Sequence, residues 1–355
     1  MKNFKIGKRM IGRDHPTYFV ADIAANHDGD LKRAKKLIYL CAEAGADAAK
    51  FQNFKAEKIV SKYGFENLED ISSHQAAWKK SVFEVYKDVS ISQDWTSELK
   101  ATCKKAGIDY FTTPYDFDSI DKVDPYVDVY KIGSGDITWL EIIDYIAKKG
   151  KPVMIASGAS TIEDVKRAMK VLMKKTKKIV LMQCNTNYTG SLENFKYTNL
   201  NVLKTYQKLY PDIILGLSDH TPGHSTVLGA VTLGAKVIEK HFTDDNLRVG
   251  PDHGFAMNPK TWRNMVDRTR ELELSLGDGL KRIEENEKKS IIVQRRSLRT
   301  VRNIKVGEII KKEDIESLRP IPVNGIPPYE VSKLINKKLI KSLKKGEHFT
   351  WKHFR

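Results

Sequence analysis

Cysteine is scarce in this sequence. Cys41, Cys103 and Cys184 are the only three among 355 residues, and no two of them form a Cys-x-x-Cys pair. This excludes a disulfide framework and a structural zinc site built from paired cysteines. Thiols so few and so widely spaced fit a protein of the reducing cytosol.

Long apolar runs are absent as well. No segment approaches the roughly 18 consecutive apolar residues that a membrane-spanning helix requires. The opening stretch MKNFKIGKRMIGRDHPTYF contains no apolar core of the kind found in secretory signals. We therefore expect a cytoplasmic protein with neither a secretory signal nor a membrane partner.

Acidic residues are outnumbered by basic ones. The chain has 61 Lys and Arg against 45 Asp and Glu, a formal net charge of +16 at pH 7. Residues 281–355 alone contain 20 basic and 9 acidic residues, an excess of 11. A nucleic-acid surface is one hypothesis for such a tail, but few aromatic residues lie among these charges to stack on bases. We therefore expect no nucleic-acid partner, and either a solvated basic surface or a basic lid over an anionic substrate.

Apolar, strand-like runs alternate with amphipathic, helix-like runs up to about residue 277. The runs that read as buried strands are 18–24, 48–52, 109–114, 129–135, 152–157, 178–184, 213–219 and 237–242. Helical patterns such as TIEDVKRAMKVLMKK separate them. Eight such units predict an α/β fold, a (β/α)₈ TIM barrel over residues 1–280, with a doubly wound sheet as the alternative.

Two segments interrupt this rhythm. Residues 55–91 form a long insertion after the second strand, a common location for substrate-binding loops. Residues 281–292 read as a charged linker. Residues 293–355 then contain short extended pieces, a Gly-centred turn and the stretch NGIPP. We expect them to form a separate small β-rich domain.

Polar side chains close nearly every predicted strand. The C-terminal strand ends of a (β/α)₈ barrel form its active-site face. Because so many of these ends are polar here, they predict a functional site rather than a set of capping residues. These strand-end residues are Asp22, Lys50, Gln52, Thr113, Lys131, Ser134, Asp136, Ser157, Thr186, Tyr188, Ser218, Asp219, His220, Lys240 and His241.

His220 and His241 end neighbouring strands. Two neutral imidazoles with an open coordination sphere suit a divalent transition metal completed by water or substrate, and two structural histidines are the alternative. No third His or Cys ligand is evident nearby, so we do not expect a closed zinc site. Lys50 is either a Schiff-base lysine or an anion clamp. Hydroxyl donors for a phosphate would come from Thr113, Ser134 and Ser218.

Seven motifs and the C-terminal stretch make the sequence similar to a known family. In order, the motifs are ADIAANHDGD, AGADAAKFQ, FTTPYD, YKIGSGD, GLSDHT, EKHFTDD and GPDH. Over nearly its whole length the chain resembles the sialic acid (N-acetylneuraminate) synthase family of nonulosonate synthases. Its tail, with VGEIIKKEDIESLRP and NGIPP, resembles that family's C-terminal SAF, or antifreeze-like, domain.

The resemblance implies a transferase that joins phosphoenolpyruvate to the open-chain aldehyde of an N-acylated amino sugar and releases phosphate. It implies a divalent metal, usually Mn²⁺ with Mg²⁺ or Co²⁺ as substitutes, on His220 and His241. It also implies a domain-swapped homodimer in which each small domain covers the partner's barrel. The implied phosphoenolpyruvate-binding residues are Lys50, Thr113, Ser134, Thr186, Tyr188 and Ser218.

The remaining implied positions concern the sugar and the chemistry. The sugar-binding residues would be Gln52, Tyr115, Asp252 and Arg319, the last reaching the sugar's acyl group from the partner's small domain. A carboxylate would stabilise positive charge developing at C2 of phosphoenolpyruvate and help to deliver water. The implied catalytic residues are Asp22, Lys50, Asp136 and Asp252.

The sequence departs from the family pattern at two carboxylates. Asp22 and Asp136 stand where glutamate is expected, and each change shortens the reach by roughly 1.5 Å, enough to lose a direct hydrogen bond. We expect Trp139 to add bulk near the same mouth. These departures predict a shifted acceptor, a 2,4-diacetamido-trideoxyhexose, with N-acetylmannosamine or a phosphorylated sugar as the alternatives.

Two rival functions follow from the same residues. The first is another phosphoenolpyruvate-condensing barrel that acts on a sugar phosphate, but such relatives lack a SAF-like tail and commonly use a cysteine ligand. The second is a non-catalytic glycan-binding relative, which the retained Lys50, His220, His241 and Asp252 argue against.

Overall fold

The computed structural model describes residues 3–68, 75, 78–92 and 94–355, and the chain divides into two compact units, Met1–Gly277 and Asp278–Arg355. The larger unit contains a closed barrel of parallel strands in the order β10-β3-β4-β5-β6-β7-β8-β9. The predicted (β/α)₈ fold is therefore confirmed, and the doubly wound alternative is wrong.

The barrel strands coincide with the eight apolar runs. Nearly all of their residues are buried, because one face of each strand fills the barrel and the other packs under helices, which explains their continuous apolar character. The strands are β3 (Tyr18–Asp22), β4 (Ala48–Asn53), β5 (Asp109–Pro114), β6 (Tyr130–Ile132), β7 (Val153–Ala156), β8 (Ile179–Cys184), β9 (Ile214–Asp219) and β10 (Ala235–His241).

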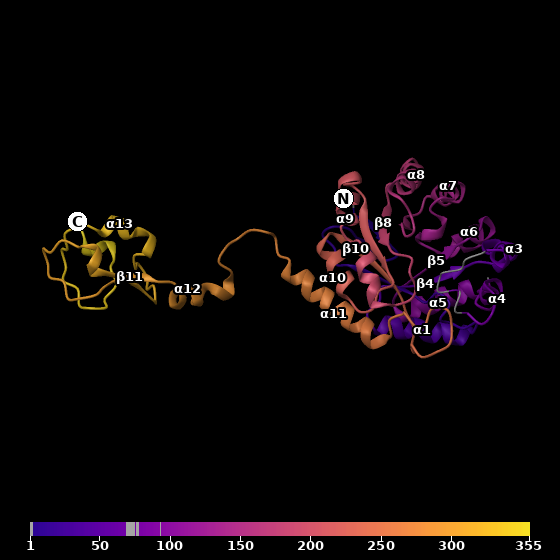
Figure 1. The fold of residues 1–355 in the computed structure, drawn as a ribbon, viewed down its shortest axis with the longest axis horizontal. Coiled ribbons are helices and arrows are strands. Elements are labelled where there is room, and N and C mark those ends of the chain that lie inside the picture. The colour runs from indigo at the N-terminus through magenta and orange to yellow at the C-terminus, as the bar shows by residue number, and fades with distance from the viewer. Residues whose placement is uncertain (1–2, 69–74, 76–77, 93) are drawn as a thin grey trace. The chain divides into compact units, whose positions relative to one another are not determined.

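Helices follow the strands and surround the barrel (Figure 1). Local capping sets their starts: Thr161 and Asp164 form a reciprocal capping box at α8, and Asn258 caps α11 just before Pro259. The main helices are α1 (Leu31–Glu43), α5 (Trp95–Ala106), α6 (Phe117–Val123), α7 (Leu140–Lys148), α8 (Ile162–Met173), α9 (Val202–Leu209), α10 (Ser225–Thr232) and α11 (Pro259–Ser275).

Two additions accompany the barrel. An antiparallel hairpin of β1 (Phe4–Ile6) and β2 (Arg9–Ile11) precedes the first barrel strand. The predicted insertion at 55–91 contains α2 (Ala56–Ile59), α3 (Lys62–Glu66) and α4 (Val82–Asp88), and its residues 69–74 and 76–77 lie outside the described part of the chain.

The smaller unit has a core of its own. It contains α12 (Lys288–Gln294), the antiparallel pair β11 (Ser297–Thr300) and β12 (Ile315–Leu318), and α13 (Val331–Leu334). The stretch that we expected to be a linker, 281–292, thus includes part of a helix. The buried core residues are Leu298, Ile304, Ile310, Ile326, Leu334, Leu339, Leu343, Phe349 and Phe354. Across the described ranges of the chain, no helix is long and apolar enough to cross a bilayer.

Strand register brings several of the predicted site residues to one level of the barrel. Where β10 meets β3 and β3 meets β4, His241 pairs with Asp22, and Asp22 pairs with Lys50. One layer deeper, Ser218 of β9 pairs with Glu239 of β10. Because neighbouring residues in register point to the same side of a sheet, these side chains meet inside the barrel mouth.

Candidate active site

A cavity of about 390 Å³ opens at the C-terminal ends of the barrel strands. Its size is within the range of small-molecule sites. Twelve of the fourteen predicted site residues line it: Asp22, Lys50, Gln52, Thr113, Tyr115, Ser134, Asp136, Tyr188, Ser218, His220, His241 and Asp252. Ten of these were predicted at strand ends, whereas Tyr115 and Asp252 were implied only by the family resemblance, and all twelve lie around one space.

The other two predicted residues do not line this cavity. Thr186 lies in the loop after β8, where its methyl group packs beside Gly158. Arg319 belongs to the smaller unit and is exposed there. Their roles in binding phosphoenolpyruvate and sugar stay predictions. Trp139, which we expected near the mouth, is not among the lining residues, and its ring packs edge-on against Phe117 instead.

Two lysines and two acids form a buried charge cluster at one side of the cavity. The Nζ atom of Lys50 lies 2.6 Å from Asp22 Oδ2 and 3.4 Å from Glu239 Oε1. Lys131 Nζ donates to the same Glu239 oxygen at 2.8 Å, and Ser218 Oγ donates to it at 3.2 Å. All four charged side chains are at most 4% exposed.

This cluster keeps Lys50 charged. Burial lowers the pKa of Lys50, but the carboxylates of Asp22 and Glu239 outweigh burial and raise it. Burial likewise raises the pKa of Glu239, but Lys131 and Lys50 outweigh this and hold it at about 2. An anionic ligand arriving here would meet two ammonium groups whose desolvation the fold has already compensated with acids.

Glu239 and Lys131 were not assigned a role from sequence. Glu239 precedes His241 by two residues on the same strand, so the period-2 alternation of a strand places both on the cavity face. This two-residue spacing could have predicted that Glu239 faces the cavity. The prediction was not made because Glu239 lies inside an apolar run. Lys131 was recognised only as a strand-end residue.

The two histidines face each other across the mouth. Their ring centroids lie 5.4 Å apart. The Nδ1 of His220 is 2.8 Å from the backbone oxygen of Asn185 and therefore donates its proton there, which leaves Nε2 with a free lone pair. Burial, reinforced by nearby positive charge, lowers the pKa of each imidazole to about 3, so both rings are neutral.

This donor set fits an open metal site. The Nδ1 of His241 is buried without a hydrogen-bond partner among the described residues, an arrangement that a metal or a ligand would relieve. In the part of the chain that the structure describes, no group of three or more His, Cys, Asp or Glu is arranged to hold a metal. Two neutral imidazoles would leave the remaining positions to water and substrate.

Two carboxylates lie beside His241, and a third, Asp136, lines the same cavity. Asp22 Oδ2 lies 3.6 Å from His241 Nε2, and Asp252 Oδ2 lies 3.8 Å from His241 Nδ1. Burial is the main cause that raises the pKa of Asp252 to about 7, and burial raises that of Asp136 to about 6. Groups with pKa values near neutrality can exchange protons with a substrate. The shortened Asp22 still reaches Lys50 directly, at 2.6 Å.

The insertion supplies an apolar wall to the same cavity. Phe54 packs against Tyr86 with the ring planes tilted by 52° and the centroids 5.4 Å apart, and it meets Tyr115 edge-on at 5.9 Å. The lining residues of this wall are Phe54, Ile59, Trp78, Val85, Tyr86 and Val89. One side of the cavity thus contains the charged residues and the two histidines, and the other side is lined by aliphatic and aromatic side chains.

Comparison with known proteins gives consistent results. The chain is 34% identical to N,N'-diacetyllegionaminic acid synthase of Legionella pneumophila, covering 96% of each protein. It is 30% identical to N-acetylneuraminate-9-phosphate synthase of Homo sapiens, covering 96% of this chain and 93% of that one. A solved structure, N-acetylneuraminic acid synthetase from Leptospira borgpetersenii serovar Hardjo-bovis, matches with a TM-score of 0.72 at 26% identity over 82% of this chain and 95% of that chain.

Family models cover most of the sequence. The NeuB family matches residues 37–281, and the SAF domain matches residues 295–355. The relatives are synthases, so the prediction of an enzyme is confirmed, and so is the resemblance seen in the sequence motifs. The chain belongs to the NeuB family and carries a C-terminal SAF domain.

Proposed function

We propose that this protein condenses phosphoenolpyruvate with the open-chain form of a 2,4-diacetamido-trideoxyhexose, giving a nonulosonic acid and inorganic phosphate. The observation that carries the proposal is the joint presence, in one cavity, of two charged buried lysines and two neutral imidazoles. A polyanion and a polarisable aldehyde are the two reactants that such a pair of subsites would bind side by side.

Phosphoenolpyruvate would bind at the lysine side. Lys50 and Lys131 offset the charges of its phosphate and carboxylate, and the hydroxyls of Thr113, Ser134 and Ser218 supply further donors around the same strand ends. The Thr113 hydroxyl is buried without a partner among the described residues, which suits a donor that awaits a ligand.

The sugar aldehyde would lie at the histidine side. His220 and His241 would hold the divalent metal, Mn²⁺ in the first instance, which when bound supplies Lewis-acid polarisation of the aldehyde oxygen. The C2=C3 electron pair of phosphoenolpyruvate forms a bond to the aldehyde carbon, and the aldehyde oxygen takes up a proton to become a hydroxyl. The surrounding carboxylates stabilise the positive charge at C2 and accept the proton of the water that adds there. The C2–oxygen bond to phosphate then breaks while the added hydroxyl gives up its proton and becomes the C2 ketone, so one phosphate leaves for each carbon–carbon bond formed.

The apolar wall supports a deoxygenated acceptor. A sugar with a methyl group at C6 buries that group favourably against side chains such as Ile59, Val85 and Val89, whereas a hydroxymethyl or phosphorylated C6 loses hydration there. The legionaminic acid synthase and the N-acetylneuraminate-9-phosphate synthase are similarly distant from this chain, at 34% and 30% identity. The choice of acceptor sugar is therefore supported by the apolar wall and not by sequence identity.

A panel of acceptors tests the substrate proposal. With phosphoenolpyruvate and Mn²⁺, we expect kcat/KM for a 2,4-diacetamido-trideoxyhexose to exceed that for N-acetylmannosamine by about 10-fold or more, as one apolar contact commonly discriminates. N-acetylmannosamine 6-phosphate should react more slowly still. Phosphate release is the readout, and a preference for either hydroxylated sugar would contradict the assignment of the wall.

Arg319 tests the predicted domain-swapped homodimer. If the SAF domain of a partner subunit presents this exposed side chain to the sugar's acyl group, Arg319→Ala should raise KM for the sugar about 10-fold and leave KM for phosphoenolpyruvate nearly unchanged. Arg296→Ala is the matched control, because Arg296 is an exposed arginine of the same unit whose guanidinium donates to Ser317. Equal effects of the two variants would contradict the role of Arg319.

A further inference from the structure

Asp252 sits in a long loop that closes on itself. This loop, residues 243–256, begins and ends side by side, because Thr243 N donates to Met257 O at 2.9 Å and Met257 N donates to His241 O at 2.8 Å. Asn246 braces its interior by donating to the backbone oxygens of His253 and Ala256. These contacts fix the base and the interior of the loop but do not attach its tip to the barrel.

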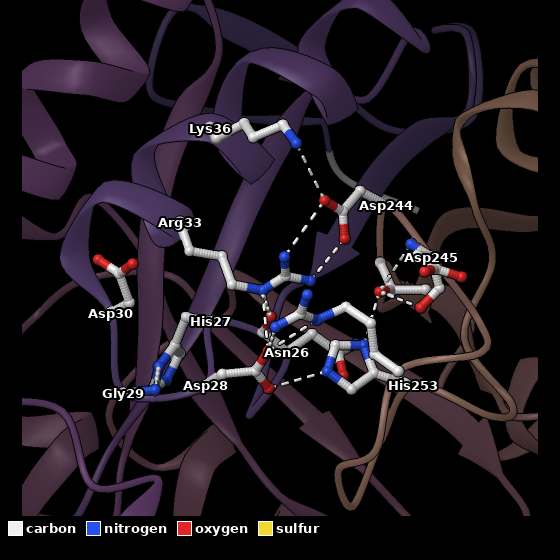
Figure 2. Close-up of polar contacts among 12 residues, drawn as sticks. Asn26, His27, Asp28, Gly29, Asp30, Arg33, Lys36, Asp244, Asp245 and His253 are labelled. Carbon is white, nitrogen blue, oxygen red and sulfur yellow. Dashed lines mark hydrogen bonds and ion pairs between the residues drawn. The ribbon is translucent and has the colours of Figure 1, made fainter.

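The attachment comes from the turn after β3. His253, which is fully buried, contacts Thr243 Oγ1 at 2.7 Å through Nδ1 and Asp28 Oδ1 at 2.9 Å through Nε2 (Figure 2). A carboxylate only accepts, so the Nε2–H of His253 donates to Asp28. Arg248 from the same loop donates to the other oxygen of Asp28 at 2.7 Å. One carboxylate thus holds the loop at two points.

Asp28 is itself held in place from α1. Arg33 Nε lies 3.1 Å from Asp28 Oδ2 and donates to Asn26 O at 2.7 Å, while its other nitrogens pair with Asp244 (Figure 2). Partial burial would raise the pKa of Asp28, but its bonds to His253 and Arg248 outweigh burial and lower it. The backbone of Asp28 is left-handed, with φ of 51°, a conformation that Asp tolerates better than most residues.

The same turn also contacts the two carboxylates beside His241. Ala24 N donates to Asp22 Oδ1 and Ala25 N donates to Asp252 Oδ2, each at 3.1 Å. Ala24 has a φ of 44°, a left-handed conformation, and the successive N–H groups of Ala24 and Ala25 each face a different carboxylate. The turn thus contacts the loop twice: Asp28 pairs with His253 and Arg248, and Ala25 N donates to Asp252, which belongs to the same loop.

We propose that Asp28 and His253 are positioning residues that hold the 243–256 loop so that the Asp252 carboxylate stays beside His241. This inference rests on the proposed function only for its kinetic consequence. Because a displacement of about 1 Å can cost about 100-fold in rate, Asp28→Ala should lower kcat by that order. KM for phosphoenolpyruvate should change little, since Lys50 and Lys131 lie on other strands.

A double-mutant cycle separates positioning from general stability. Asp28→Ala should lower kcat about 100-fold in the native background and less than about 3-fold in the Asp252→Asn background, because a residue that acts through Asp252 has no further effect once Asp252 is changed. Asp30→Ala is the matched control: it removes another carboxylate of the same turn, one that accepts from Lys32 N at the start of α1 rather than from the loop, and it should leave kcat nearly unchanged. Equal losses in both backgrounds would overturn the proposal.

A structural readout makes the test independent of the reaction. Amide hydrogen exchange over residues 246–253 should accelerate about 10-fold or more in Asp28→Ala and His253→Ala and return toward native rates in His253→Gln, whose amide can still donate to Asp28. Unchanged exchange in the two alanine variants overturns the anchor, whatever the substrate. Absence of phosphate release by the native protein with every acceptor would instead contradict the proposed function alone.

Discussion

His241→Ala is expected to lower phosphate release from phosphoenolpyruvate and acceptor by at least about 1,000-fold, since polarisation of the aldehyde by a metal contributes several kcal/mol to the barrier. His241 ends β10 at the cavity, and its Nδ1 has no hydrogen-bond partner within the described residues. The same variant should lose tight binding of Mn²⁺, which electron paramagnetic resonance of the free ion measures without any turnover.

His224→Ala is the matched control for this loss. His224 lies just before α10, close in sequence to His220, but it does not line the cavity. It should keep native Mn²⁺ binding and native kcat. Native turnover in His241→Ala would remove the two-histidine site from the account, and equal loss in both variants would point to a general effect on folding.

Lys131→Met is expected to raise KM for phosphoenolpyruvate by about 10–100-fold, the equivalent of one charge-assisted hydrogen bond of about 1.5–3 kcal/mol. Lys131 Nζ is 2.8 Å from Glu239 and faces the cavity, so an incoming anion can share it. After the change, Glu239 still has Lys50 as a cationic partner at 3.4 Å, which limits the loss of folding stability. Steady-state phosphate release at varied phosphoenolpyruvate measures the effect, and KM for the sugar should move little.

Lys240→Met distinguishes lost binding from lost stability. Lys240 is as deeply buried as Lys131, but it pairs with Asp219 and donates to Thr221 O at 2.5 Å, away from the cavity. Its removal leaves Asp219 buried without its ammonium partner, which should destabilise the fold by about 3–5 kcal/mol and lower Tm. KM for phosphoenolpyruvate should stay within about twofold, by contrast with Lys131→Met. A similar rise in both variants would mean that Lys131 supports the fold rather than the ligand.

The barrel could be predicted from sequence because its strands are buried on both faces. Runs such as IVLMQC in β8 leave no periodic polar face, and helices with clear caps separate them. The site could be predicted in outline because parallel strands put their C-terminal ends together, so His220 and His241, twenty-one positions apart, had to meet.

The remainder depended on contacts that sequence spacing does not encode. Glu239 pairs with lysines from β4 and β6, and only closure of the barrel brings these strands around one space. The approach of Asp252 to Ala25 arises where β10 meets β3, the seam that joins the two ends of the barrel. The contact of Trp139 with Phe117 could not be predicted, because position along the chain does not specify which way the ring turns.

The most direct test of the central claim is the stoichiometry of phosphate and nonulosonic acid formed from phosphoenolpyruvate, with and without acceptor sugar and Mn²⁺. We expect one phosphate for each nine-carbon acid, release that requires the sugar, and loss of both products when a chelator removes the metal. Phosphate release that continues without sugar, or acid formation that survives complete metal removal, would contradict it.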